Sequence, residues 1–317
     1  MITTTTLPTA QATATPATVV TAFISSLDVK QATRNTYTRA LQAFICWVAE
    51  TGRALDSLDA ADIIAYKQHL LSTHSTATTA ISIAAIHRLY SWVEDNGGKN
   101  IARKIHAPKI RKTFTRQHLT PAESRAVVAA ARNNRDKAII TLMLATGLRE
   151  VEITRLNIGS IKVRHIVNEQ GEEVSRRVLQ VWGKGRDTAD AFVVIPTAAW
   201  SVLLDYLATR PLTAANAPLF TANSTNNNGG RLSTRAIRAI VGGALKRVGL
   251  TGVEYSTHSL RHTAAVAALR NGASIMAVQG MLRHASPATT QIYLDSIRGE
   301  LRLTNAAEDA AASYLCI

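Results

Sequence analysis

Hydrophobic positions in the first third of the chain recur at the spacing of α-helices. The two clearest sets are Tyr37, Leu41, Phe44, Ile45 and Val48, and then Ile81, Ala85, Leu89 and Val93. Shorter helices are expected at 16–26 and 59–73. Four helices with short joints predict a small bundle over residues 16–98.

The second part of the chain opens with a strong helix start. Thr120 and Glu123 have the spacing of a capping box, and Pro121 occupies the first helical position. A buried helix is expected from about 136 to 146, and Gly147 is suited to end it because glycine adopts a left-handed backbone readily.

After residue 160 the pattern changes from helical to strand-like. Segments 161–167, 177–182 and 191–195 are rich in Val and Ile and are separated by turn residues, which predicts a small antiparallel sheet. Helices are then expected at 197–208, 234–248, 259–270, 274–282 and 287–297. The predicted fold class is therefore mainly α with a small antiparallel β-sheet.

The charge sharpens this organisation. With 317 residues the chain is long enough for two domains, and its net charge of +14 favours a polyanionic partner, either nucleic acid or an anionic membrane. Residues 1–98 carry six basic and seven acidic side chains, residues 99–116 carry seven basic and no acidic ones, and residues 117–317 carry 23 basic and 15 acidic ones. The most apolar run, 138–148, is too short to span a membrane.

The basic segment 99–116 is predicted to be a linker between two domains. It follows two glycines, contains a proline and lacks compensating acids, so it is either a solvated hinge or a strap along phosphates. Its cations are Lys99, Arg103, Lys104, Lys109, Arg111, Lys112 and Arg116. The expected organisation is a disordered tail over 1–15 without a secretory signal, a helical domain over 16–98, the linker over 99–116, and a larger domain over 117–317 with a C-terminal tail helix.

Several polar residues stand where packing alone explains them poorly. Arg149 follows the glycine that ends an apolar helix, and Glu152 shares its face if the chain becomes helical again. Lys184 lies between two glycines at the end of a predicted strand, a turn that lets its amine reach a phosphate. Each motif alone is weak, because surface ion pairs and glycine turns are common.

Three histidines and a tyrosine complete the set. His258 and Arg261 lie on one helical face, and His262 is spaced from His258 like a zinc pair, but a general-base Glu and a third ligand are missing. His284 precedes a helix that carries Tyr293 two turns in. Taken singly, each of these residues is better explained by a structural role.

Together and in this order, they resemble the tyrosine recombinase or phage integrase family, of the lambda-integrase and Xer types. The resemblance rests on Arg149 with Glu152, Lys184 in a hairpin, His258-x-x-Arg261, and His284 followed nine residues later by Tyr293. The phrases Thr-Gly-Leu-Arg, His-Ser-Leu-Arg-His-Thr and Thr-Thr-Gln-Ile-Tyr are especially similar. It implies a SAM-like core-binding domain over 16–98 and a catalytic domain over 117–317.

The resemblance implies a site-specific recombinase that cleaves and rejoins DNA through a 3′-phosphotyrosyl intermediate and a Holliday junction. Tyr293 is then the nucleophile, Lys184 the general acid, and His258 a general base or orienting group. Arg149, Arg261 and His284 bind the phosphate oxygens, and Glu152 orients them. No metal, cofactor or ATP is implied.

Arg283 stands where many members have glycine, and Leu-Asp follows Tyr293 instead of Thr-His. Neither change removes a catalytic group. The rival tyrosines, Tyr255 and Tyr314, lack the preceding histidine. The apolar end of the C-terminal tail is expected to dock either on its own domain or on a neighbouring protomer.

The implied partners are a duplex recombination site, a dimer per site, a tetramer in the synapse and an accessory directionality factor. The implied location is the prokaryotic cytoplasm, at the nucleoid, which the two distant cysteines also favour. A mobile-element integrase and a dimer resolvase both fit. The alternatives are a type IB topoisomerase-like enzyme and a non-catalytic DNA-binding regulator with a helix-turn-helix.

Overall fold

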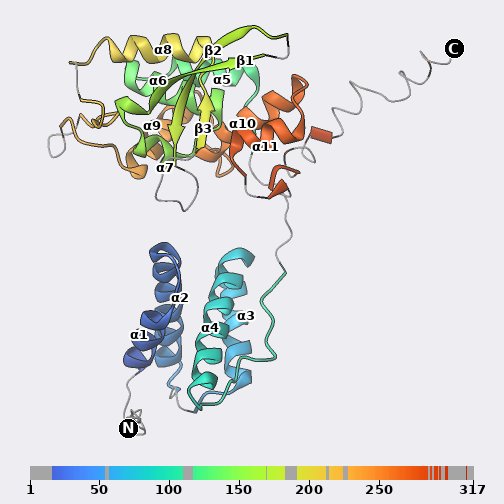
Figure 1. Ribbon diagram of the computed structural model, residues 1–317. Helices are drawn as coiled ribbons and strands as arrows, with labels where there is room; N and C mark the ends of the chain where they lie inside the picture. The colour runs from blue at the N-terminus through green and yellow to red at the C-terminus, as the bar shows by residue number, and fades with distance from the viewer. Residues whose placement is uncertain are drawn as a thin grey trace, which may run out of the picture. The chain divides into compact units, whose positions relative to one another are not determined.

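The computed structural model divides the chain into two compact units, Met1–Thr113 and Phe114–Ile317, each of which is described by itself (Figure 1). The structure describes residues 16–53, 57–109, 117–168, 170–182, 191–211, 214–223, 228–284, 286–287, 289–291, 293, 297–298 and 312. The predicted tail over 1–15, the segment that carries Lys184, and Tyr314 lie outside these residues.

The first unit is the expected bundle of helices. Its elements are α1 (Pro16–Ser26), α2 (Gln31–Glu50), α3 (Ala60–Thr73) and α4 (Thr76–Asp95). Their apolar faces meet in one core, in which Leu41, Phe44 and Ile83 are buried. Asp59 begins α3 with a complete capping box, and Ser75 caps α4, so local side chains fix where both helices start.

The beginning of the basic segment packs against this bundle. Ala102 and Ile105 are buried in the core of the helical unit. The amine of Lys67 donates to the carbonyl of His106 over 2.8 Å, and Arg103 pairs with Glu94 at the end of α4. The residues of this segment up to about 106 are therefore anchored to the helical unit.

The second unit combines helices with a three-stranded antiparallel sheet in the order β1-β2-β3. Its first elements are α5 (Pro121–Ala129), α6 (Asn134–Thr146), α7 (Glu150–Arg155), β1 (Ile161–Val167), β2 (Glu173–Val181) and β3 (Ala191–Val194). They are followed by α8 (Thr197–Leu207), α9 (Thr234–Arg247), α10 (Thr257–Arg270) and α11 (Ile275–Leu282). The fold is thus mainly helical with one small sheet, as predicted.

The expected start signals occur as predicted, and one strand is longer than expected. Thr120 and Glu123 form a capping box with Pro121 at the first turn, and Gly147 ends α6 with a left-handed backbone. Strand β2 begins at Glu173 instead of 177, because Glu173 and Val174 pair with the end of β1. These added residues are polar or half-exposed, so a search for buried apolar runs misses them.

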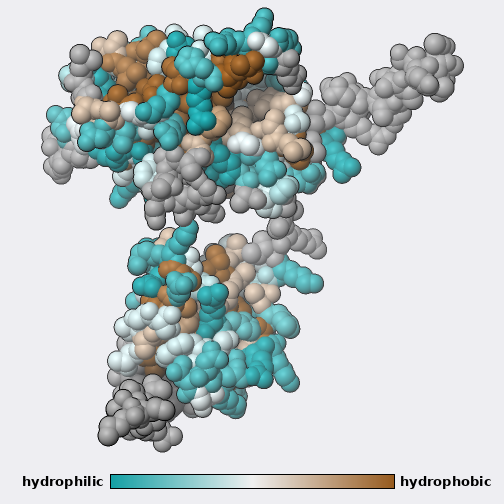
Figure 2. All heavy atoms as spheres, viewed as in Figure 1, coloured by the Kyte–Doolittle hydropathy of each residue, from teal (hydrophilic) through white to brown (hydrophobic). Residues whose placement is uncertain are grey.

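The core of the second unit lies around α6, which contacts α8 and α10 and buries residues on all its faces. The inner half of β2 also packs into this core, whereas β1 is exposed along nearly its whole length. Figure 2 shows apolar surface on this unit near α8 and the sheet, where Val163, Val194 and Leu204 are exposed. No helix among the described residues is long and apolar enough to cross a membrane.

Candidate active site

The first pair of site residues lies where α6 ends and α7 begins. Gly147 has φ 62°, and a Cβ placed on it would lie 2.5 Å from Leu282 Cδ2, so this turn requires glycine. Arg149 follows as the residue that caps α7. Its Nη1 donates to Glu152 Oε1 over 2.9 Å, and its backbone N–H donates to Glu152 Oε2 over 2.7 Å. Helix α7 therefore holds both residues together, as their spacing indicated.

Arg261 reaches the same turn from α10. Its side chain is buried, and it donates to the carbonyl oxygens of Gly147 and Leu282. Burial, and then the nearby charge of Arg149, lower the pKa of Arg261 to about 10, which still leaves it a cation at neutral pH. The guanidinium thus joins the ends of α6 and α11.

A third guanidinium, that of Arg283, completes the cluster. Arg283 ends α11 with φ 55° and ψ 45°. Among the described residues, it is the single residue other than glycine with a positive φ. Its Nη2 lies 2.7 Å from Glu152 Oε2, and its Nε lies 3.3 Å from Glu152 Oε1. Its Nη1 donates to the carbonyl of Met281 over 2.6 Å. Glu152 therefore accepts hydrogen bonds from two arginines.

His284 and Tyr293 lie beside this cluster. The Nδ1 of His284 lies 2.8 Å from the hydroxyl oxygen of Thr290, and its ring stacks on that of Tyr293, with centroids 5.9 Å apart. The ring of His262 also stacks on that of Tyr293, with centroids 5.0 Å apart. The half-buried Tyr293 thus contacts two imidazoles and lies near the charge of Arg261.

Burial and neighbouring charges shift the pKa values of Glu152, His284 and His262. Burial alone would raise the pKa of Glu152, but Arg283 and Arg149 outweigh it and lower that pKa, so the carboxylate is ionised. Burial lowers the pKa of His284 to about 4, helped by Arg261, Arg149 and Arg283. Burial, and then His118, lower the pKa of His262 to about 3. Both imidazoles are therefore neutral at neutral pH.

His258 lies at the exposed start of α10, apart from the buried His262 on the same helix. A second acid supports this region. Glu150 forms an ion pair with Arg238 of α9 and accepts a hydrogen bond from the Thr257 hydroxyl over 3.0 Å. Burial alone would raise the pKa of Glu150, but these two contacts outweigh burial and lower it. Glu150 therefore connects α7 and α9 to the first turn of α10, which contains His258.

The structure describes only some of the remaining residues of the predicted site. Lys184 lies outside the described residues, as do Arg111, Lys112 and Arg116. The other linker cations are exposed, and they are Lys99, Arg103, Lys104 and Lys109. Within the described parts of the chain, no group of three or more His, Cys, Asp or Glu side chains has the arrangement of a metal site.

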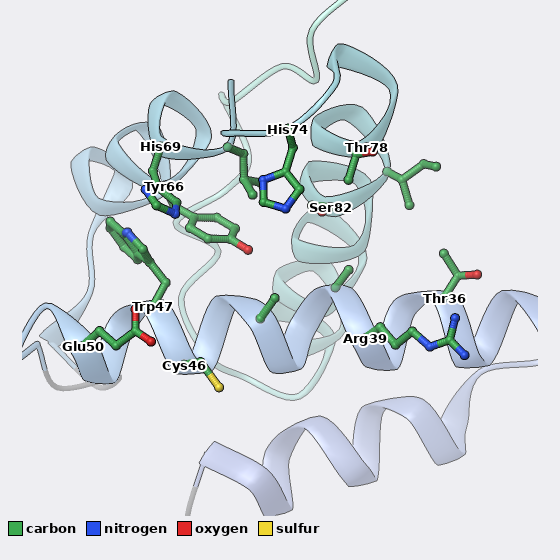
Figure 3. A pocket seen from close by; sticks show the side chains of 14 residues that line it. Thr36, Arg39, Cys46, Trp47, Glu50, Tyr66, His69, His74, Thr78 and Ser82 are labelled. Carbon is green, nitrogen blue, oxygen red and sulfur yellow. The ribbon is translucent and has the colours of Figure 1, made fainter. Parts of the chain in front are cut away.

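A separate hollow of about 460 Å³ lies in the helical unit, between α2, α3 and the start of α4 (Figure 3). Trp47, Tyr66 and Cys46 line it, and the Tyr66 hydroxyl points into the space between the helices. That hydroxyl is buried without a hydrogen-bond partner, and burial together with Cys46 raises its pKa to about 12. None of the predicted site residues lines this hollow.

Three residues of the site are not predicted from the sequence. The spacing of His262 from His258 indicates a shared helix but not its stacking on Tyr293. The departure of Arg283 from the family pattern is the available signal for its contact with Glu152. Glu150 carried no signal, because its partners Arg238 and Thr257 are 88 and 107 positions away.

Comparisons with known proteins show the family of the chain. Residues 117–299 match the phage integrase family, and residues 19–97 match the phage integrase N-terminal SAM-like domain. The chain is 30% identical over 274 residues to tyrosine recombinase XerD of Neisseria meningitidis serogroup B, covering 84% of this chain and 87% of the relative. It is 32% identical over 228 residues to tyrosine recombinase XerC of Corynebacterium glutamicum, covering 69% of this chain and 68% of the relative.

Solved structures of recombinases have the same fold. XerH site-specific recombinase bound to a palindromic difH substrate aligns with a TM-score of 0.69 at 19% identity, over 93% of this chain and 85% of that one. A lambda integrase dimer bound to a core site aligns with a TM-score of 0.64 at 17% identity, over 87% of this chain and 76% of that one. The chain belongs to the phage integrase family and is a tyrosine-type site-specific recombinase.

Proposed function

We propose that this recombinase cleaves and rejoins duplex DNA through a 3′-phosphotyrosyl intermediate, with Tyr293 as the nucleophile. The observation that carries the proposal is the place of Tyr293, against the rings of His262 and His284 and near the charge of Arg261. A nucleophile beside fixed cations attacks where negative charge develops on the phosphate, and such charge stabilisation is a large part of phosphoryl-transfer catalysis.

The chemistry assigns distinct roles to the cluster. Arg149 and Arg261 bind the non-bridging phosphate oxygens, since guanidinium groups match that geometry. His284 stays neutral, and when its Nδ1 accepts from Thr290 its Nε2 donates a hydrogen bond to the same phosphate. Glu152 orients Arg149 through two hydrogen bonds.

The reaction then proceeds in two exchanges at phosphorus. The Tyr293 oxygen forms a bond to phosphorus as the bond to the 5′-oxygen breaks, and the tyrosine proton passes to a base. His258, exposed at the start of α10, is the proposed base or orienting group, and Lys184 is the proposed acid that protonates the 5′-oxygen. A new 5′-hydroxyl reverses these steps on another strand, so no external energy source is needed.

The proposed partner is a duplex recombination site bound by two protomers, with four protomers in a synapse that resolves through a Holliday junction. Solved relatives with this fold include a lambda integrase dimer bound to a core site, which supports the proposal. The exposed linker cations Lys99, Lys104 and Lys109 are proposed to contact DNA phosphates, which would make binding salt-dependent. The positive charge of residues 99–317 also favours a polyanion.

The test is covalent trapping on DNA. A recombination site is first selected from random duplexes by binding to the Tyr293→Phe protein, and a suicide duplex carrying it is incubated with each variant. The wild type should form a covalent adduct, Tyr293→Phe should form none, and the rival-tyrosine control Tyr255→Phe should react like the wild type. An adduct that persists in Tyr293→Phe would refute this nucleophile.

A further inference from the structure

The turn after α11 contains an arrangement that the proposed chemistry does not yet use. Arg283 adopts a left-handed backbone, φ 55° and ψ 45°, a conformation that favours glycine because a Cβ crowds the following carbonyl. An arginine there also brings a charge into the protein interior, since only 8% of its side chain is exposed. Both features need compensation from the contacts that this side chain makes.

The contacts of Arg283 are directed at one carboxylate. Its Nη2 and Nε reach the two oxygens of Glu152 at 2.7 and 3.3 Å, and its Nη1 is bound to the Met281 carbonyl. All three guanidinium nitrogens of Arg283 contact acceptors within the protein, and two of them lie on Glu152. The most direct route from Arg283 to the reaction is therefore through Glu152 or through the turn itself.

Glu152 transmits this contact to Arg149. The same carboxylate accepts from Arg149 Nη1 over 2.9 Å and from the Arg149 backbone over 2.7 Å. Arg283 contacts both oxygens of this carboxylate as well, so Arg149 is held against an acceptor whose rotation is restricted. The Arg149 side chain is 20% exposed, against 8% for Arg283, so Arg149 is the more accessible of the two arginines.

The turn connects the same clamp to the other side of the site. His284 follows Arg283 directly, and its backbone N–H donates to Gln279 over 3.2 Å while its ring meets Thr290 and Tyr293. One side chain therefore joins α7, which carries Arg149, to the turn that carries His284. These two segments are 131 residues apart in the chain, as measured from Glu152 to Arg283.

We propose that Arg283 is a positioning residue of the recombinase site: it clamps Glu152 and thereby aligns Arg149 and His284 on the scissile phosphate. This inference rests on the proposed function, because it assigns Arg283 a role in aligning groups that bind the phosphate. In metal sites, residues that orient the binding groups without contacting the substrate change activity by about 10–100-fold, and we expect an effect of the same order here.

The experiment uses the full chain and the selected suicide duplex described above. Arg283→Gly removes the guanidinium and relieves the left-handed backbone, whereas Arg283→Lys keeps the charge without the planar fork. Arg135→Lys is the matched control, because Arg135 is also a poorly exposed arginine paired with an acid, Asp136, and bound to a carbonyl, that of Thr221. The rate of adduct formation at saturating protein, DNA affinity and thermal stability are measured for each variant.

Arg283→Gly should slow adduct formation by about 10–100-fold with unchanged DNA affinity, Arg283→Lys should restore part of the rate, and Arg135→Lys should react like the wild type.

The pH profile of adduct formation separates a positioning role of Arg283 from a simple loss of stability. The groups facing Glu152 are Arg149 from α7, Arg261 from α10, and Arg283 and His284 after α11. Removal of Arg283 leaves burial less opposed and raises the pKa of Glu152, so the acidic limb of the rate profile should move to higher pH.

The outcomes are distinct. A wild-type rate and pH profile in Arg283→Gly overturn the positioning role while leaving the proposed function intact. A slower rate that accompanies a lower melting temperature, with an unmoved pH profile and no rescue by Arg283→Lys, also overturns it, because Arg283 is then only structural. If the wild type forms no adduct, or Tyr293→Phe still forms one, the proposed function fails and this inference fails with it.

Discussion

The two units of this recombinase have different interiors. The described interior of the helical unit is apolar and aromatic, with Thr79 and Ser82 as its buried polar side chains. The described interior of the second unit buries Glu152, Arg261 and His262 among others. Desolvated charges are costly unless they are paired, so the second unit must place its ions accurately as it folds.

The difference shows what each interior is for. Aromatic rings fill the helical core, where Phe44 lies 5.0 Å from Tyr66 between centroids. In the second unit, the ends of α6, α7, α10 and α11 meet at Glu152 and its arginines. Apolar packing depends on shape and volume, whereas this charge cluster also requires defined hydrogen bonds. Substitutions in the first unit should therefore act on stability, and those in the cluster should act on chemistry and stability together.

The largest expected effect is on the helical core. Phe44→Ala should lower the free energy of unfolding of the helical unit by about 3–5 kcal/mol, because a buried ring is replaced by a cavity. Hydrogen exchange resolved by peptide should show the loss in residues 16–95 and leave residues 117–284 protected. Equal loss of protection in both units would contradict the separation of the two cores.

Arg261→Ala tests the charged interior. Loss of one preformed donor to the phosphate should slow adduct formation by about 10²–10³-fold, or about 2.7–4 kcal/mol in activation free energy. The carbonyls of Gly147 and Leu282 also lose their donor, so stability is followed in parallel. Arg261→Lys, which keeps a positive charge, should be less impaired. Adduct formation at the wild-type rate in the alanine variant would remove Arg261 from the site.

Acid should weaken the second unit through His262. Its pKa is about 3 in the folded protein and about 6.5 when unfolded, so between these values the unfolded chain binds more protons and stability falls as the pH falls. From pH 7 to pH 5 the loss should be about 2 kcal/mol. Denaturation of the second unit at both pH values measures it, and His262→Gln should reduce the difference. An undiminished difference in that variant would assign the acid sensitivity to other groups.

The smallest expected effect on stability is at Tyr66, which carries a polar group in the mainly apolar helical core. Tyr66→Phe removes a buried hydroxyl that lacks a hydrogen-bond partner, so it should stabilise the helical unit by about 1 kcal/mol. Denaturation of the two proteins compares them directly. A destabilised variant would mean that the hydroxyl has a bound partner in the hollow of Figure 3.

Much of the architecture follows from local signals in the sequence. Helical spacing of apolar residues predicted α2 and α4, and the Thr120–Glu123 box and Gly147 marked where helices start and end. These helix signals are reliable because each depends on residues within one or two turns of the same segment. The resemblance of several separated motifs predicted Arg149, Arg261, His284 and Tyr293 as site residues, and the fold brings these four together.

What the sequence determined by itself was the set of elements, the family and the residue types of the site. The tertiary structure alone decided that Arg283 shares Glu152 with Arg149 and that His262 lies against Tyr293. It also decided that Ala102 and Ile105 of the basic segment pack in the helical core. Such contacts join segments far apart in the chain. Their energies depend on burial and on the distance and angle between the contacting groups, which no local sequence pattern encodes.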